Sequence, residues 1–464
     1  MQHNPIAAAA ALAAALLALP APSANAQTAP TPTEAELASK LDKLGAELAE
    51  LKAQLAELRR QNGTAAPVSS TGTASSATPA APASASAAPA AAASTTSAAT
   101  TQTAGAARVE QSAAAAPATV LTSYGEINLN VPTNATSEAR SDLVRFVLGY
   151  QHRFDEKTKV VAELEVEHAV SSADDVGEVA VEQAFVERQL NATWAGQLGL
   201  FLMPVGLLNG NHEPTAYYGV ERNFVETAII PSTWREGGLQ FIGSFDNGFT
   251  LNLGVSTGFD VGKWDAGSQE CVDYPLACIH QELSQARARD AAVFGRLDWR
   301  GVPGLLLGGS IFTGGAGQGQ PNVPSSRVTL GEVHARWQPG RWDLRALASW
   351  GSISNTAAFN LPIVGNPALV PKSFDGWYVL AAYKLWTQAD YTLTPFARFE
   401  RYNTGRSYAD IGPGLTPPSL PTQQVVTVGV DFKIGQGVVL KADYQDFKVN
   451  SDLNRVSLGL GWNF

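Results

Sequence analysis

The sequence has little charge and no long apolar segment after its N-terminus. Only 16% of the 464 residues are charged, and the mean hydropathy is −0.04. Beyond residue 26, no stretch reaches the ~20 consecutive apolar residues that a transmembrane helix requires. A helical membrane protein is therefore excluded. The low charge, together with 42 glycines and 10 tryptophans, still suits a transmembrane β-barrel, because alternating strands leave no peak in averaged hydropathy.

Cysteine is also scarce, since Cys271 and Cys278 are the only two. In an exported chain their close spacing favours a local disulfide over a metal site or a nucleophile, with two unpaired thiols as the alternative. Enzyme motifs are missing as well. The triplet at His212 lacks the second histidine of a zinc-protease helix, and Pro214 opposes a helix there. We expect no catalytic residue, no metal site and no cofactor.

The first 26 residues have the pattern of a secretory signal peptide. An apolar run over residues 6–19 precedes the small-residue stretch 24–26. No lysine or arginine precedes the run, so an alanine-rich tail or a misassigned start codon is the alternative. We interpret residues 1–26 as a signal peptide for export.

Residues 33–62 carry a leucine heptad repeat. Thr33 and Glu36 form a capping box at its start. Glu47 and Lys52 take the g and following e positions, which a parallel coiled coil pairs across its interface. Seven leucines are spaced four and three residues apart, at Leu37, Leu41, Leu44, Leu48, Leu51, Leu55 and Leu58. We therefore expect an α-helical coiled coil between parallel copies of the chain, with the number of copies left open.

Residues 63–118 consist almost entirely of alanine, serine, threonine and proline. Such a composition cannot bury a core. A flexible chain of this length has an r.m.s. span of roughly 40 Å. We predict a disordered linker that tethers the coiled coil to the rest of the chain.

Strand patterns occupy residues 119–464. Apolar and polar residues alternate in segments such as 126–131, 249–256 and 426–434, so each strand has one apolar and one hydrated face. About sixteen such segments occur, each close to the ~10 residues that cross a bilayer at a tilt. Short turns, including 246–248, 387–390 and 435–437, alternate with long connections at 204–236, 258–290, 314–326, 353–373 and 403–422.

This rhythm predicts an all-β fold, a transmembrane antiparallel β-barrel of about sixteen strands. A soluble pair of β-sandwiches would not need such regular alternation of short and long connections. Outer-membrane barrels have short periplasmic turns and longer external loops. An even number of strands also returns both ends of the barrel to the periplasm, where the linker and the coiled coil would lie.

The last ten residues, RVSLGLGWNF, fit the closing strand of such a barrel. Leu460, Trp462 and Phe464 continue an apolar face, and Gly459 and Gly461 continue a small one. We expect the apolar face to meet lipid and the small face to meet the channel. Pairing with the first strand would leave no exposed edge. Phe464 is similar to the C-terminal signal that barrel-assembly machinery recognises.

The inward positions of the strands carry charges of both signs. A barrel of about sixteen strands leaves an aqueous channel rather than a packed core. These charges are predicted to line it, with simple hydration of the wall as the alternative role. The candidate lumen-lining residues are Arg145, Arg153, Glu163, Glu165, Arg296, Arg345, Arg398 and Lys433.

The third long connection, 204–236, is the predicted constriction. It contains Tyr217, Tyr218, Phe224 and Trp234, and a loop this apolar would be a poor surface loop. We expect it to fold inward and narrow the channel. Its charged residues either project into the channel or pair with the wall to hold the loop, and both roles stay open. They are Arg222, Arg235, His212, Glu213, Glu221, Glu226 and Glu236.

Residues 199–241 resemble the phosphate-selective porin O and P family. The shared features are a strand running into Pro-x-Gly-Leu at 204–207, the pair Glu221-Arg222, and Arg-x-x-Gly-Leu-Gln-Phe at 235–241. The similarity extends loosely over residues 119–464. It implies a homotrimeric outer-membrane diffusion porin with sixteen strands per chain, in which the third loop is the constriction and basic residues attract anions.

Charge leaves the solute open. Residues 119–464 contain 26 lysines and arginines against 35 acidic residues, so no dominant positive field is expected. The field inside a narrow pore depends on local charges, and Arg222 and Arg235 remain candidates for attracting anions such as phosphate.

The main alternative function is structural, with the coiled coil tethering the outer membrane to peptidoglycan. A trimeric autotransporter is disfavoured because it contributes only a few strands per chain. We expect a homotrimer in the outer membrane of a Gram-negative bacterium, joined through the coiled coil and the barrel walls. Its expected partners are outer-membrane lipid and the barrel-assembly machinery, and no nucleic acid.

Overall fold

The computed structural model describes residues 118–170, 172 and 176–464. The predicted signal peptide and coiled coil, and all of the predicted linker except residue 118, lie outside this part of the chain. None of the helices within it has the length and apolar character of a membrane-spanning helix.

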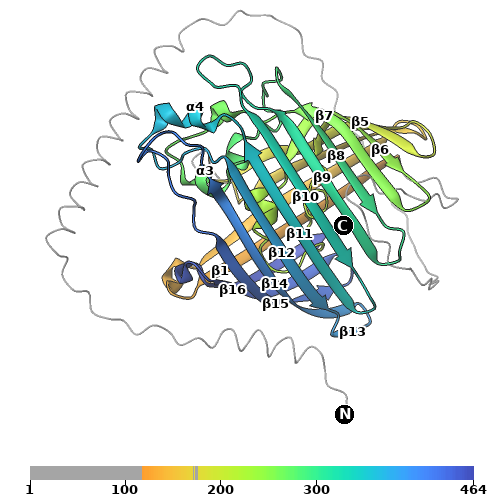
Figure 1. Ribbon diagram of the computed structural model, residues 1–464. Helices are drawn as coiled ribbons and strands as arrows, with labels where there is room; N and C mark the ends of the chain where they lie inside the picture. The colour runs from red at the N-terminus through yellow and green to blue at the C-terminus, as the bar shows by residue number, and fades with distance from the viewer. Residues whose placement is uncertain (1–117, 171, 173–175) are drawn as a thin grey trace, which may run out of the picture. The chain divides into compact units, whose positions relative to one another are not determined.

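The described residues form one closed antiparallel sheet (Figure 1). Each strand pairs with its neighbour in sequence. Because β12 and the short β13 both pair with β14, they occupy one position in the wall, and the barrel has the predicted sixteen strand positions. The strands are β1 Thr119–Pro132, β2 Arg140–Arg153, β3 Thr158–Glu167, β4 Glu178–Gln189, β5 Trp194–Leu202, β6 Arg235–Ser244, β7 Phe249–Thr257, β8 Ala291–Trp299, β9 Leu305–Gly315, β10 Arg327–Trp337, β11 Trp342–Ile353, β12 Ser373–Tyr383, β13 Trp386–Gln388, β14 Tyr391–Ser407, β15 Gln423–Ile434, β16 Val438–Phe447 and β17 Arg455–Asn463.

Short and long connections alternate around the barrel and define two rims. The short-turn rim holds residues 245–248 and 435–437, for example, and the long-loop rim holds 203–234 and 258–290. One predicted turn, 387–390, is shorter than expected because β13 continues to Gln388. The helices of the described residues are short and lie in connections at the long-loop rim: η1 Thr136–Glu138, η2 Val225–Ile229, η3 Val261–Lys263, α3 Gln269–Asp273, η4 Ala277–Ile279, α4 Thr356–Asn360, η5 Leu361–Ile363 and η6 Ser451–Leu453.

The barrel closes between its first and last strands. β17 pairs with β1 from Tyr124 opposite Asn463 to Pro132 opposite Arg455. Beyond this ladder, the Phe464 N–H donates to the Ser123 carbonyl at 2.9 Å, and the Ser123 N–H donates back at 3.1 Å. The C-terminal strand is therefore not an exposed edge, as the sequence predicted.

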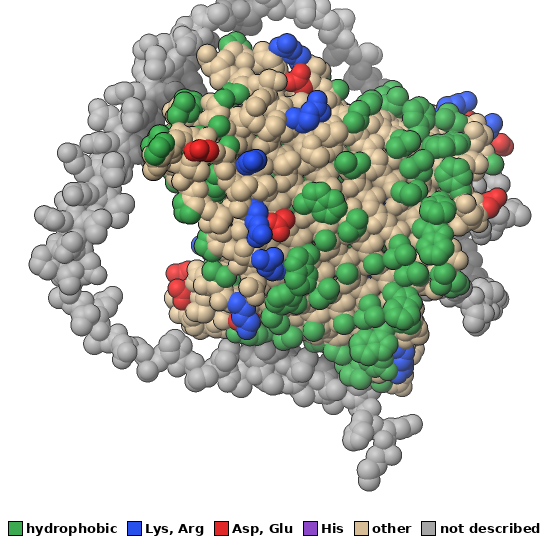
Figure 2. All heavy atoms as spheres, in the orientation of Figure 1, with side chains coloured by type: hydrophobic (Ala, Val, Ile, Leu, Met, Phe, Trp, Pro, Cys, Tyr) green, Lys and Arg blue, Asp and Glu red, His purple; other side chains and the backbone are tan. Residues whose placement is uncertain are grey.

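The outer face of the wall is apolar, as the alternation requires. Figure 2 shows hydrophobic side chains spread over the visible wall, with charged side chains gathered mainly near its margins. Exposed apolar side chains come from strands around the whole barrel, among them Leu148, Leu198, Val293, Ile311, Val333, Val379 and Val428. This surface suits a lipid environment.

The glycines of the last strand make room on the inner face. A Cβ atom at Gly461 would lie 2.5 Å from the Cβ of Pro214, and one at Gly459 would lie 3.2 Å from Val220. Pro214 and Val220 belong to the connection between β5 and β6. The small face of RVSLGLGWNF therefore meets this connection, so the small residues are needed for packing.

We predict that Gly461→Val unseats the connection, because overpacking a filled site costs about 1–3 kcal/mol. Trypsin should then cleave after Arg222, which is only 8% exposed in the native chain. The control is Gly196→Ala, whose new Cβ would make an ordinary 3.6 Å contact with Phe241. Equal protection of Arg222 in both variants, at unchanged β-sheet content, would contradict this assignment.

Candidate constriction site

The connection between β5 and β6, residues 203–234, lies inside the barrel, and we call it the inner loop. Met203, Val225, Ile229 and Trp234 are fully buried. Its helical turn η2 contacts β11, β12 and β14, and Figure 1 shows the turn within the ring of strands. A cavity lined by Tyr217, Tyr218, Tyr378 and neighbouring residues between the loop and this part of the wall has a volume of only about 10 Å³. The loop is therefore packed against the wall.

Basic side chains of the wall bind the backbone of the inner loop. Their donor nitrogens lie 2.6–3.4 Å from its carbonyl oxygens. The pairs are Arg296 with Gly206, Lys433 with Thr215, Arg345 with Ala216, Lys441 with Tyr217 and Gly219, and Arg398 with Tyr218 and Glu221. Buried charges are costly unless they are paired and hydrogen-bonded, so these contacts satisfy both the cations and the loop carbonyls.

Acidic side chains of the wall bind the N–H groups of the same segment. Asp431 accepts from Gly219 N–H at 3.3 Å, Asp443 from Val220 N–H at 2.6 Å, and Glu400 from Phe224 N–H at 2.6 Å. The wall thus supplies donors to the loop carbonyls and acceptors to the loop N–H groups. These hydrogen bonds hold residues 215–224 in one position against the wall.

Glu226 holds the two ends of the inner loop together. Its carboxylate accepts from Leu207 N–H at 2.6 Å and Leu208 N–H at 2.7 Å, from Asn223 at 3.0 Å and from the Tyr378 hydroxyl at 2.9 Å. Every one of these donors is turned toward a buried carboxylate. The geometry gives Glu226 a positioning role in the loop.

His212 joins the inner loop to β4. Its Nδ1 lies 2.8 Å from the Asn209 carbonyl, and its Nε2 lies 2.7 Å from Glu182 and 2.7 Å from the Tyr124 hydroxyl. The Tyr124 hydroxyl also donates to Glu182 at 2.8 Å, so the three side chains form one buried cluster. The buried pair of His212 and Glu182 therefore anchors the loop.

Two further loop carboxylates are held by amides of the wall. Glu221 accepts from Asn130 at 2.9 Å, and Glu213 accepts from Asn463 at 2.7 Å. Glu236 falls just outside the loop, since β6 begins at Arg235, and it accepts from the Trp234 indole at 3.2 Å. Glu213 and Glu221 thus contact the wall through hydrogen bonds from asparagine amides and not through ion pairs.

Most of the predicted lumen-lining residues are also paired. Within 3.1 Å, Arg145 contacts Glu126 and Glu165, Arg296 contacts Asp298, Arg345 contacts Asp343, and Arg398 contacts Glu400. Glu163 accepts from Gln183, Lys433 binds the inner loop, and Arg153 is exposed at the end of β2.

Several of these partners are not among the candidate residues, and Asp343 and Glu182 illustrate two reasons. Asp343 follows the simple alternation of β11, so its inward position could have been deduced. Glu182 could not, because the register of β3 and β4 shifts between Glu163 and Leu164. A β-bulge of this kind moves side chains to the other face, and the sequence carries no strong signal for it.

Three arginines converge on Thr233 at the end of the inner loop. The Thr233 hydroxyl accepts from Arg222 at 2.9 Å and from Arg145 at 3.3 Å, and its carbonyl accepts from Arg235 at 3.4 Å. Thr233 itself has a φ of 52°, a conformation that non-glycine residues rarely adopt. The Nε groups of Arg222 and Arg235 are buried and have no hydrogen-bond partner among the described residues.

A second long connection, 258–290, packs against the end of the inner loop and the start of β6. The ring of its Phe259 stacks on Trp234 with centroids 5.1 Å apart. A disulfide joins Cys271 and Cys278 in this connection, with Cα atoms 5.1 Å apart. Glu282 forms an ion pair with Arg235 at 3.2 Å. In the part of the chain that the structure covers, no group of three or more His, Cys, Asp and Glu side chains is placed to hold a metal ion.

His280 lies beside this ion pair. Burial, with the nearby charges of Lys263 and Arg235, lowers the pKa of His280 from 6.5 to about 4. The unfolded connection therefore binds a proton more readily than the folded one. The stability that neutral His280 gives to the folded connection is fully present above pH 6.5, and it is lost progressively as the pH falls toward about 4.

We predict that connection 258–290 opens more often near pH 4 than above pH 6.5. Hydrogen exchange of its amides, corrected for the intrinsic pH dependence, measures this opening. The His280→Gln variant should lose most of the pH dependence, because glutamine does not titrate. An identical pH dependence in the variant would assign the effect to another group.

Comparisons with known proteins bear on the fold. No family model matches the chain. An uncharacterised protein of Aquifex aeolicus (strain VF5) is 29% identical over 357 residues, which cover 74% of this chain and 79% of that protein. The structure of Salmonella typhi OmpF in complex with daunomycin has a TM-score of 0.53 at 13% identity, over 75% of this chain and 97% of that one.

The anion-selective porin from Comamonas acidovorans matches with a TM-score of 0.45 at 12% identity, over 75% of this chain and 100% of that one. The likeness to OmpF shows that the barrel has the fold of outer-membrane porins. It does not extend to a family within that fold, so the resemblance of residues 199–241 to the porin O and P family stays a prediction.

Proposed function

We propose that this chain is an outer-membrane diffusion porin for small hydrophilic solutes, narrowed by the inner loop. The observation that carries the proposal is the inner loop itself, clamped inside a closed barrel by charged side chains of the wall. A sixteen-stranded barrel is wide enough for an aqueous channel. Partly exposed basic side chains near the short-turn rim, Lys159, Arg300 and Arg336, are 16%, 35% and 20% exposed and keep that end hydrated.

We further propose a preference for anions, with phosphate as one candidate. Its support is the convergence of Arg222 and Arg235 on Thr233, with two buried Nε groups that lack an acceptor. A buried donor without a partner costs about 1–3 kcal/mol. The positive charges of the two arginines would attract an anion that moves past the inner loop.

The assembly belongs to the same proposal. The chain is exported by residues 1–26, recognised by barrel-assembly machinery through Phe464, and joined into a homotrimer by the barrel walls and by the coiled coil of residues 33–62 in the periplasm. The porin fold of the barrel and the leucine heptads support this arrangement.

A structural function is the second candidate. The heptads and the long linker would allow the coiled coil to reach peptidoglycan and anchor the membrane, with the pore secondary. The composition of residues 63–118, in which Val68 and Val109 are the only apolar side chains larger than alanine and proline, favours a tether.

Deletion of residues 27–118 separates the two candidates. We predict that the shortened chain still inserts and conducts ions in a planar bilayer, because the barrel closes through β1 and β17 alone. Cells carrying it should keep their outer membrane attached. A shortened protein that inserts without conducting would refute the pore. Detachment of the outer membrane at normal conductance would favour the tether.

Replacing both Arg222 and Arg235 by glutamate should move the reversal potential in a KCl gradient toward cation selectivity. Double replacement by glutamine should give a smaller shift in the same direction, and it guards against misfolding caused by the new charges. The control is Arg341→Glu in the exposed turn between β10 and β11. An unchanged potential in both double variants would leave the two arginines with a structural role only.

A further inference from the structure

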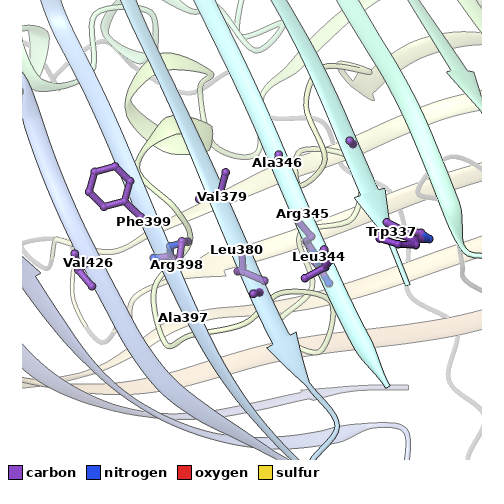
Figure 3. Close-up of a pocket in the computed structure, with 12 residues that line it drawn as sticks. Trp337, Leu344, Arg345, Ala346, Val379, Leu380, Ala397, Arg398, Phe399 and Val426 are labelled. Atoms are coloured by element: carbon purple, nitrogen blue, oxygen red, sulfur yellow. The ribbon is translucent and has the colours of Figure 1, made fainter. Parts of the chain in front are cut away.

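The outer face of the barrel is hollowed across β10, β11, β12, β14 and β15. The hollow has a volume of about 530 Å³, and Figure 3 shows the side chains that line it along neighbouring strands. We call it the wall groove. Four alanines on adjacent strands and five larger apolar residues make up most of its lining: Ala335, Ala346, Ala381 and Ala397, with Trp337, Leu344, Val379, Phe399 and Val426. Arg345, Leu380 and Arg398 of the same strands also border it.

The strand register places the alanines in two offset pairs. Ala335 lies opposite Ala346, and Ala381 lies opposite Ala397. Between β11 and β12, Ala346 faces Val379 and Ala381 faces Leu344. Trp337 and Leu344 border the groove toward the short-turn rim, because β10 ends and β11 begins there. Phe399 and Val426, which pair with each other, border it toward the long-loop rim. The groove therefore runs along the membrane-facing wall.

A cation stands at the long-loop end of the groove. Arg401 follows Phe399 by two residues on the same face of β14, about 7 Å farther along the strand. Its neighbours across the ladders are Trp377 and Gln424. No carboxylate of the described residues lies within 4.0 Å of Arg401, whereas nearby Arg406 has Asp375 at 3.6 Å. Figure 2 shows basic and acidic side chains together on this part of the wall.

We propose that the wall groove holds an acyl chain of a phosphate-bearing lipid whose head group is bound by Arg401. The occupant must be apolar along the groove and anionic at one end, which matches such a lipid. Trp377 beside Arg401 is typical of the level where acyl chains meet head groups. Guanidinium and phosphate groups form strong charge-assisted hydrogen bonds.

A second copy of the chain fits this face less well. Two convex barrel walls in contact would leave the hollow empty, and interiors of proteins tolerate few voids of that size. A protein partner would also have to supply a carboxylate for Arg401. An acyl chain fills the hollow without either requirement. The inference rests on the membrane location contained in the proposed function.

Native mass spectrometry of the full-length protein, in the detergent that preserves its assembly, tests the lipid site. The probe is bis-phosphorylated lipid A, with diacylglycerol and inorganic phosphate as separate arms. We expect lipid A to bind at least about tenfold more tightly than diacylglycerol or inorganic phosphate, because only lipid A has both phosphate groups and acyl chains.

Two variants test the two ends of the site. Arg401→Glu should weaken lipid A binding by about tenfold or more, in line with loss of a charged hydrogen bond. Ala381→Leu should weaken it by filling the groove while Arg401 stays in place. The matched controls are Arg188→Glu and Ala184→Leu, since both positions are exposed on β4 of another part of the wall, and neither change should alter binding.

Conductance of each variant in a planar bilayer shows that its barrel is intact. Equal lipid A binding by Arg401→Glu and its control would overturn the inference, and so would dissociation of the assembly by Arg401→Glu, which would make this face a contact between copies. A wild-type protein that conducts but does not retain lipid A refutes only the lipid site. One that retains lipid A without conducting refutes the proposed channel instead.

Discussion

The structure depends on the contact between buried wall cations and the carbonyl oxygens of the inner loop. Each side satisfies the other: Lys441 donates to loop carbonyls, and Arg345 and Arg398 use donors on the loop in addition to their wall carboxylates. Without these donors the carbonyls of residues 215–221 would be buried and unpaired. Removing one partner of such a contact leaves the other buried and unpaired. The loop and the wall therefore specify each other.

This contact changes how the arginines of the lumen are interpreted. Charges on the inner wall of a barrel first suggest binding groups for passing ions. Arg296, Arg345 and Arg398 instead use their donors on carboxylates of the wall and on loop carbonyls. Among the buried side-chain atoms of the described residues, the Nε atoms of Arg222 and Arg235 are donors without a hydrogen-bond partner. Arg296, Arg345 and Arg398 of the inner wall are therefore used to hold the loop.

The two faces of the wall follow different requirements. On the inner face, Gly459 and Gly461 leave space for Val220 and Pro214, so small residues serve close packing. On the outer face, small residues such as Ala381 leave a hollow that no other part of the described chain fills. Small residues thus give a packed contact on the inner face and an open groove on the outer face, because the inner loop fills the space only on the inner face.

The sequence by itself determined the barrel: its strands, the alternation of short and long connections and the closure by RVSLGLGWNF. These features follow from a period of two and from turn residues, which are local properties of the chain. It also indicated the inner loop from its apolar content, but not the partners that hold it.

Only the tertiary structure decided those partners, because they lie far apart in sequence. Lys441 binds the carbonyl of Tyr217 across 224 residues, and Phe224 binds Glu400 across 176. The register shift after Glu163 also moved Glu182 to the inner face, where it meets His212. Local alternation predicts which side of a strand a residue occupies until a bulge intervenes, and it carries no information on what stands opposite across the barrel.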